Sequence, residues 1–414
     1  DKPEWIAIGT DEEPFSGIFN GAGHSVKLGI SREETAAGPH MVGLFGVVTG
    51  AVTNLTVTGS FSVKLRGGYA APIAATLAGG KILNCTNKAS ITAEEIVNDE
   101  TGIMHVGGIV GAVRGGAQSL VKNCTNDGEI QMKALNLPMG DGELGDGTRG
   151  ALGGIVGYTC NGVAADITNC INNGNIFVNG GNDDIGGILG MTCSNNDNSI
   201  ANITYCGNKG DIIVHNIQGE RAAGIVAYIK NGKLCYSYNT GNVLAYTDDG
   251  KTLAHRDYGT HFGILGYANL PASCPLEMTY CYTAGEQAAE AELGVIRNPN
   301  NGTLKNNFCL EGREDWETEV NSNLHNSRGE DAIRFTSAED LLPKLTAAAE
   351  DKNAYKENPV PGGYPVLYHE VPAALPDNAL GYESETKEEV LGNNLSDLYF
   401  VMQAGSQTDA QGLT

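Results

Sequence analysis

Tyrosines are the residues whose spacing most directly suggests a binding surface. Tyr158, Tyr228 and Tyr267 stand at the same offset after short, glycine-bounded apolar segments, and Met191 holds that place in another copy. A tyrosine offers a flat apolar face and a polar tip, a combination suited to sugar rings. The pattern therefore predicts a column of tyrosines that either contacts a glycan or forms a stacked structural ladder.

Two further tyrosines lie where the chain varies most. Tyr246 and Tyr258 fall within the long insertion 244–261, and a second long insertion covers 131–152. Insertions in repeat proteins project from a rigid scaffold and are common places for binding. We therefore predict ligand contacts in these two insertions.

The insertion 131–152 contains an acidic loop. Its stretch GDGELGDG places Asp141, Glu143 and Asp146 close together. Calcium accepts carboxylate oxygens at such alternating spacing, although the full spacing of an EF-hand is absent. Calcium bound by these three residues is the one cofactor that the sequence suggests, and the alternative is a solvated turn.

Paired acids occur at the same variable corner. Asp183 with Asp184, and Asp248 with Asp249, stand in turns rich in Asn and Gly. Two carboxylates flanking a sugar linkage would suit glycoside hydrolysis, but acids in such turns are more often turn residues. The sequence contains no HExxH, GxSxG, P-loop or dinucleotide motif. These observations leave enzymatic activity undecided and favour binding without catalysis.

The composition excludes some partners. A formal net charge of −23 argues against nucleic acid, because phosphate binding depends on Lys and Arg. No apolar run approaches the roughly 20 residues of a membrane-spanning helix, so we expect no membrane insertion in this segment. The 57 glycines and the charged fraction of 18% describe a chain of short strands and many turns. We expect an extracellular or bacterial cell-surface location, with any signal or anchor outside these residues.

A repeat determines where all these residues lie. GGIVG at 107–111 returns at 153–157, and looser copies follow at 186–190, 223–227 and 262–266. A second signature, such as NCTNDGEI, follows each copy, so each repeat supplies about three short strands. Such strands bury a core when each coil stacks on the last. This predicts an all-β fold, a single-stranded parallel β-helix of about seven to eight coils, right-handed as parallel crossovers usually are.

Cysteines recur at fixed places in this repeat. A second column contains Cys160 and Cys193, and the gap in the first is filled by Ser237. The first column consists of Cys85, Cys124, Cys170, Cys206, Cys281 and Cys309. Side chains stacked on parallel strands point the same way, so we predict buried free thiols, with disulfides across coils as the alternative.

The repeats resemble the GLUG repeat, which has a Gly-Leu-hydrophobic-Gly core. GLUG repeats are found in bacterial surface proteins and in the N-terminal region of IgA-specific metallopeptidases. The segment 5–30 is similar to the stretch that precedes such repeats, and GLFGVVTGAVTNLTVTGS at 43–60 is similar to a full repeat. The resemblance covers roughly residues 4–310, and GYPVL at 363–367 is similar to the usual close. It implies a parallel β-helix at the cell surface.

The repeat boundaries suggest the domain organisation. Residues Trp5, Phe15 and Phe19 can cover the first coil, and a helix is predicted within 337–355. Ser337 and Asp340 form a capping-box-like start, although Pro343 lies near enough to shift it. The predicted parts are an N-terminal cap at 1–30, the β-helix at 31–310, a small mixed C-terminal cap at 311–370, and a tail or start of another module at 371–414.

These expectations lead to one principal functional hypothesis. The chain is expected to be a non-catalytic adhesin-like or stalk module that binds a glycan or a host glycoprotein through loops on one corner of the β-helix. A carbohydrate-active enzyme, such as a polysaccharide lyase or glycosidase, is the first alternative, because such enzymes also use this fold. A passive spacer presenting further domains of the same chain is the second.

Overall fold

A computed structural model describes most of the chain and divides it into two units. Residues 1–368 form the first unit, and 369–414 form the second, of which only 369–371 are described. The fold is therefore that of the first unit. The described residues are 5–36, 38–96, 103–115, 118–134, 149–160, 162–181, 183–192, 199–215, 221–246, 260–269, 275–285, 294–297, 302–310 and 332–371.

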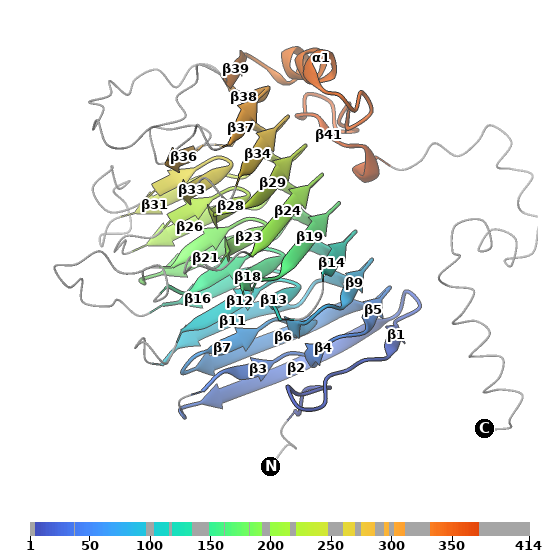
Figure 1. Ribbon diagram of the computed structural model, residues 1–414, viewed down its shortest axis with the longest axis vertical. Helices are drawn as coiled ribbons and strands as arrows, with labels where there is room; N and C mark the ends of the chain where they lie inside the picture. The colour runs from blue at the N-terminus through green and yellow to red at the C-terminus, as the bar shows by residue number, and fades with distance from the viewer. Residues whose placement is uncertain are drawn as a thin grey trace, which may run out of the picture. The chain divides into compact units, whose positions relative to one another are not determined.

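One coil of the chain passes through four sheets in a fixed order. After β9 (Lys81–Leu83) come β10 (Thr86–Asn87) and β11 (Ser90–Glu95), which share a sheet, and then β12 (Met104–Gly107) and β13 (Val110–Arg114). The next coil repeats the path, and each strand pairs in parallel with its equivalent. Figure 1 shows the coils rising in sequence order from blue to orange. The predicted parallel β-helix is confirmed.

The four parallel sheets are named 1 to 4 in the order in which the chain visits them. Sheet 1 contains β1 (Ile18–Asn20), β5 (Ala51–Thr53), β9, β14 (Ser119–Lys122), β19 (Ala164–Thr168), β24 (Ile200–Thr204), β29 (Gly232–Cys235), β34 (Leu276–Thr279) and β37 (Thr303–Lys305). Sheet 3 contains β3 (His40–Val42), β7 (Gly68–Ala70), β12, β17 (Ala151–Gly153), β22 (Asp184–Gly186), β27 (Arg221–Ala223) and β32 (Thr260–Phe262). Sheet 4 contains β4 (Phe45–Val48), β8 (Ala74–Leu77), β13, β18 (Val156–Cys160), β23 (Leu189–Thr192), β28 (Val226–Ile229), β33 (Leu265–Asn269) and β36 (Gly294–Arg297).

Sheet 2 is the largest and forks after its second strand. Its first two strands are β2 (Ser25–Glu34) and β6 (Thr56–Leu65). One branch then contains β10, β15 (Thr125–Asn126), β20 (Ile171–Asn172), β25 (Gly207–Asn208), β30 (Tyr238–Asn239), β35 (Tyr282–Thr283), β38 (Asn307–Leu310) and β39 (Ala332–Phe335). The other branch contains β11, β16 (Ile130–Lys133), β21 (Ile176–Asn179), β26 (Ile212–His215) and β31 (Val243–Tyr246).

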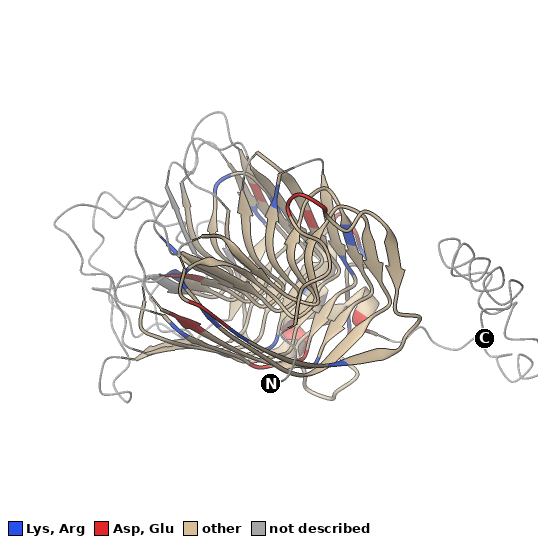
Figure 2. Cartoon of the chain, turned by 90° about the horizontal axis from the view of Figure 1, so that it is seen from below, with Lys and Arg blue, Asp and Glu red and all other residues tan. Residues whose placement is uncertain are grey.

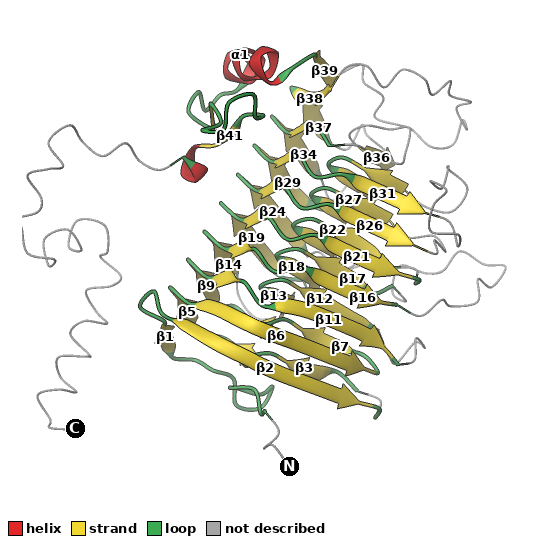
Figure 3. Ribbon diagram, turned by 180° about the vertical axis from the view of Figure 1, so that it is seen from behind, coloured by secondary structure: helices red, strands yellow, loops and turns green. Residues whose placement is uncertain are grey.

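The number of coils agrees with the repeat pattern. Within the described residues, sheets 3 and 4 contain seven and eight strands. Figure 3 shows strands throughout the stack and an α-helix only beyond its last coils. In Figure 2, which looks along the stack, acidic and basic segments lie beside each other on the sheets.

Alternating side chains of each strand point into the coil and build the core. One inward row of sheet 2 consists of Phe61, Ile91, Ile130, Ile176, Ile212 and Val243, each at most 1% exposed. Burial of apolar surface stabilises folding by about 25 cal/mol per Å². Each coil is thus held mainly by the coils above and below it.

A ladder of buried asparagines runs through the interior. The side-chain amide of each rung donates to the amide oxygen of the next at 2.7–2.8 Å. The rungs are Asn87, Asn126, Asn172, Asn208 and Asn239. The glycine pair of the repeat packs over this ladder, and a Cβ at Gly154 would come within 2.5 Å of the Asn172 Cγ. The glycines are therefore required where sheet 3 meets sheet 4.

The corner between sheets 1 and 2 uses a left-handed backbone conformation. Its residues have φ between 50° and 60° in successive coils, and they are Asn54, Asn84, Asn123, Asn169, Tyr205, Tyr236 and Tyr280. The asparagines hydrogen-bond to one another along this corner at 2.9–3.1 Å. The tyrosine rings stack instead, with centroids 4.9 and 4.8 Å apart. This explains why the repeat signature begins with Asn or Tyr.

The cysteine next to this corner points inward. The described cysteines are buried free thiols, as predicted. Cys85, Cys124, Cys170, Cys206 and Cys281 occupy one column, with Ser237 in the gap, as the strand register requires. The placement of Cys309 in that column is wrong. Cys309 pairs with Thr283 in the row of the asparagine ladder, because the preceding turn brings Asn307 next to Cys281. Cys160 is buried beside Arg114 in sheet 4, and Cys193 lies outside the described residues.

The first described residues cover the start of the core. Phe15 and Phe19 contact Phe45, with ring centroids 5.1 and 5.4 Å apart. Ile8 and Phe15 make parallel bridges to Phe45 and Val48, so this segment forms a partial rung beneath sheet 4. The aromatic cover expected here is therefore present at the two phenylalanines.

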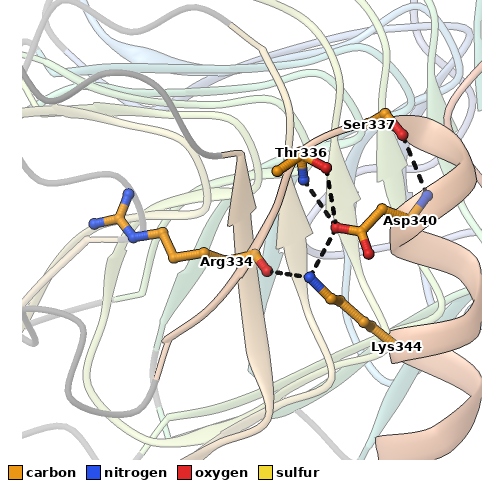
Figure 4. A network of polar contacts seen from close by, with 5 residues as sticks. All are labelled: Arg334, Thr336, Ser337, Asp340 and Lys344. Carbon is orange, nitrogen blue, oxygen red and sulfur yellow. Dashed lines mark hydrogen bonds and ion pairs between the residues drawn. The ribbon is translucent and has the colours of Figure 1, made fainter.

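The C-terminal part of the first unit contains the helix α1 (Ala338–Ala348). The Ser337 hydroxyl accepts from the backbone N–H of Asp340 at 3.3 Å, and the Asp340 carboxylate accepts from the N–H of Thr336 at 3.0 Å (Figure 4). The Lys344 ammonium donates to the same carboxylate at 2.7 Å. The predicted cap is confirmed, but Pro343 does not shift the start, because the helix begins directly after Ser337 and includes the proline.

The segment after α1 packs on the tyrosine corner. It includes β40 (Tyr355–Lys356), β41 (Val366–Leu367) and the 3-10 turn η3 (Tyr368–Glu370). The Tyr205 hydroxyl donates to Asp351 at 3.1 Å, and the Tyr355 hydroxyl donates to the Tyr280 carbonyl at 2.8 Å. This segment therefore closes one side of the last coils.

Candidate functional site

The predicted tyrosine column exists on the outer side of sheet 4. Strand register aligns Tyr158, Met191, Tyr228 and Tyr267 in successive coils. Tyr228 is only 1% exposed, whereas Tyr158 and Tyr267 are half-buried. The sequence pattern therefore located the column correctly, but its central ring is not a surface.

Side chains from sheet 3 cover this column at the outer bend between sheets 3 and 4. The Arg221 guanidinium lies 4.3 Å from the Tyr228 ring centre and 5.5 Å from that of Tyr267. His105 stacks on Tyr158 with centroids 4.1 Å apart and an interplanar angle of 7°. Ring faces are thus occupied by neighbouring side chains, and stacking of a sugar on the middle of the column is not supported.

Arg221 is positioned by one of the paired acids. Its Nε and Nη2 donate to the two oxygens of Asp184 at 2.6 and 2.7 Å, and Arg149 lies 3.9 Å from the same carboxylate. Asp184 is fully buried, so this bidentate pair lies away from solvent. A buried ion pair with this geometry orients its partners and depends strongly on both of them.

Asp183 is also fully buried, and its pKa is raised to about 7. Burial is the main cause, and the charge of Asp184 adds to it, while the Gly150 backbone and Arg149 partly oppose the shift. A hydrolytic pair must reach a substrate, whereas these two carboxylates are enclosed by protein. Asp183 and Asp184 therefore do not form the open pair that glycoside hydrolysis requires.

His105 shows the same effect of enclosure with the opposite sign. Its imidazole is buried between Tyr69 and Tyr158, and burial lowers its pKa to about 3. The ring is therefore neutral at physiological pH. It acts as a stacking element of the outer bend.

The remaining predicted residues are placed as follows. Tyr246 ends β31 on the outer face of sheet 2 and stacks on His215 at 5.1 Å, half-buried. Tyr258 lies outside the described residues. The same applies to the candidate calcium ligands Asp141, Glu143 and Asp146, and to the acids Asp248 and Asp249. Within the described part of the chain, no group of three or more His, Cys, Asp or Glu side chains could hold a metal ion.

A pocket lies at the N-terminal end of the stack, where the partial rung beneath sheet 4 ends. Its volume is about 380 Å³. It is bounded by the segment around Trp5, by the end of β2 and by the first strand of sheet 3, β3. Pockets of this size accept small ligands or part of a larger one. The pocket is thus a consequence of how the first coil begins.

Trp5 is the main aromatic group of this N-terminal pocket. Its indole N–H donates to the Gly43 carbonyl at 2.8 Å, which fixes the ring against β3 and β4. Even so, 43% of the residue is exposed. The expectation that Trp5 covers the core is therefore not met in the way that Phe15 and Phe19 meet it, since part of its surface faces outward.

Polar and charged side chains complete the N-terminal pocket. Arg32 forms an ion pair with Glu34, both from the end of β2, and Asp11 forms an ion pair with Arg114. Glu12 is exposed at the rim. Hydroxyl-rich ligands are bound by such planar polar groups beside an aromatic ring. The sequence did not suggest this set, because its members come from separate segments that only the first coil brings together.

Comparisons with known proteins identify no relative. No protein-family model, curated protein or solved structure matches this chain. The parallel β-solenoid architecture is therefore established by strand pairing within this molecule. Among the residues that the structure describes, no helix has the length and apolar character needed to cross a membrane.

Proposed function

We propose that this protein is a non-catalytic saccharide-binding module of a cell-surface β-solenoid, with its binding site in the N-terminal pocket. The observation that carries the proposal is the partly exposed, hydrogen-bonded Trp5 beside carboxylates and a guanidinium in a pocket of about 380 Å³. An aromatic ring packs against the C–H face of a sugar, and the charged groups hydrogen-bond to its hydroxyls.

The resemblance to GLUG-repeat proteins supports an extracellular, bacterial cell-surface location for this module. A glycan or the glycan of a host glycoprotein is then the partner class. A catalytic role has less support, because Asp183 and Asp184 are enclosed and Asp184 is bound by Arg221. Calcium at the loop of Asp141, Glu143 and Asp146 remains a separate proposal, tested by repeating the binding measurement with a chelator.

The test is saccharide binding by the full chain and by Trp5→Ala. We expect the wild-type protein to retain an intact saccharide from a glycan panel, and Trp5→Ala to weaken binding about 30-fold, or ~2 kcal/mol, as for a central aromatic contact. Native mass spectrometry detects the retained saccharide, and calorimetry gives the affinity.

Ile18→Ala is the matched control, because Ile18 is 70% exposed and does not line the N-terminal pocket. Its affinity should equal that of the wild type. Equal binding by Trp5→Ala and the wild type would reject the pocket as the site. Shortened or unsaturated saccharides among the products would instead identify an enzyme.

A further inference from the structure

The N-terminal pocket is joined to the outer bend between sheets 3 and 4 by one side chain. Asp11 and Met41 line the pocket, and Arg114 contacts both, through an ion pair with Asp11 and at 3.6 Å from the Met41 Sδ. The Arg114 guanidinium also lies 5.2 Å from the ring centre of Tyr69. A planar cation thus spans from the pocket wall to the first aromatic ring of the bend.

Planar groups continue from Tyr69 along the stack. Met41, Tyr69 and His105 occupy one column in successive coils of sheet 3. Tyr69 stacks on His105 with centroids 5.6 Å apart, and His105 stacks on Tyr158. Tyr69 and Tyr158 are half-buried, whereas His105 is buried, so the two tyrosines reach the surface and the histidine supports them. The column rises by about 4.8 Å per coil, so it extends the pocket parallel to the stack.

We infer that the N-terminal pocket is the end subsite of an extended site for an uncharged oligosaccharide, whose further units lie over Arg114 and Tyr69. This inference rests on the proposed function. Arg114 and the Tyr69 hydroxyl offer hydrogen-bond donors next to ring surface, and they lie directly beyond the pocket wall.

Charge selects the class of oligosaccharide. The guanidinium groups of Arg32 and Arg114 are already engaged by Glu34 and Asp11, while Glu12 is exposed at the rim. The chain as a whole carries a formal net charge of −23. An acidic saccharide would therefore be repelled, and an uncharged chain is preferred.

Chain-length dependence tests this extended site. The probes are the two-unit and six-unit members of the β-glucan, mannan and chitin series, with oligogalacturonate as the acidic counterpart, measured by calorimetry on the full chain. We expect a six-unit saccharide to bind about tenfold more tightly than its two-unit counterpart, and oligogalacturonate to bind more weakly than either. Tyr69→Ala should reduce the six-unit affinity to the two-unit value and leave the two-unit affinity unchanged.

Two further variants guard against a folding defect. Tyr69→Leu keeps most of the buried volume but removes the ring, and it should give the same result as Tyr69→Ala. Tyr246→Ala removes another half-buried stacked tyrosine, on the outer face of sheet 2, and should change neither affinity.

Several outcomes would overturn the extended site. Equal affinity for both lengths in a series that requires Trp5 would leave the proposed function standing and reject the extension. Equal weakening of both lengths by Tyr69→Leu would show that Tyr69 acts only through the fold. Tightest binding of oligogalacturonate would reject the uncharged class, and no binding in any series would reject the proposed function together with the inference.

Discussion

Buried polar side chains occur in two regions of this solenoid, and the regions are built differently. Inside the coil, the asparagines from Asn87 to Asn239 make the same neutral amide hydrogen bond at each rung. On the outer bend, one column contains His105, Ala151, Asp184 and Arg221 in successive coils. The interior rungs are interchangeable, whereas each rung of the bend depends on one particular neighbour. Uniform amides support the fold, and varied rungs give this face its individual chemistry.

The largest expected effect comes from breaking the ion pair of the outer bend. Arg221→Ala leaves the Asp184 carboxylate buried without its bidentate partner and should lower the free energy of unfolding by about 3–5 kcal/mol. Urea unfolding measures this change. Lys233→Ala is the control, because its ion pair with Glu277 is at the surface, and its loss should cost less than about 1 kcal/mol. Similar small losses in both variants would contradict the contrast.

The second prediction concerns pH. The folded protein holds the Asp183 proton more tightly than the unfolded chain, because the Asp183 pKa is raised to about 7 from 3.8, so stability falls as pH rises between these values. The His105 pKa is lowered from 6.5 to about 3, so the unfolded chain binds this proton first and stability falls as pH drops below 6.5. The two slopes, each ~1.4 kcal/mol per pH unit, oppose each other between about pH 4 and 6.5.

Single variants separate these opposing contributions. Asp183→Asn should make stability rise with pH by roughly 3 kcal/mol between pH 4 and 6.5, and His105→Phe should make it fall by a similar amount. The phenylalanine keeps a planar ring between Tyr69 and Tyr158. Denaturant unfolding across this pH range is the measurement. Unchanged pH profiles in both variants would show that neither group titrates as its burial requires.

A smaller effect is expected inside the coil. Asn172→Ala removes the acceptor of the Asn126 amide and the donor to Asn208, and should cost about 2 kcal/mol. Asn87→Ala breaks a single ladder bond, to Asn126, and should cost about half as much. Thermal and urea unfolding compare the two variants. A loss at Asn87 as large as that at Asn172 would mean that the ladder is not additive rung by rung.

The repeat made most of the fold predictable. Glycine pairs, short apolar strands and the Asn-x-Gly turns recur with the coil, so they predicted the parallel stack and the alignment of Tyr158, Met191, Tyr228 and Tyr267. Cys309 was misplaced because it lies where the repeat loses its regular turn, and spacing alone does not reveal a change of register.

The candidate site was less predictable for a physical reason. Arg221 and Asp184 become neighbours only because their coils stack, and a buried charge pair leaves no periodic signal in the sequence. The N-terminal pocket depends on where the first rung is incomplete, which a search for repeated residues does not detect. Trp5 was identified, but as a cover for the core, since sequence does not show which part of its ring faces solvent.

The uniform asparagine ladder has a consequence for the length of the molecule. Because the interior rungs are alike, duplication or deletion of a whole coil would preserve their hydrogen bonds and would leave the first coil unchanged. The reach of the stack is thus separable from the recognition surface at its beginning. Gene-level expansion or contraction of repeats would alter how far the protein extends while conserving what its N-terminal end touches.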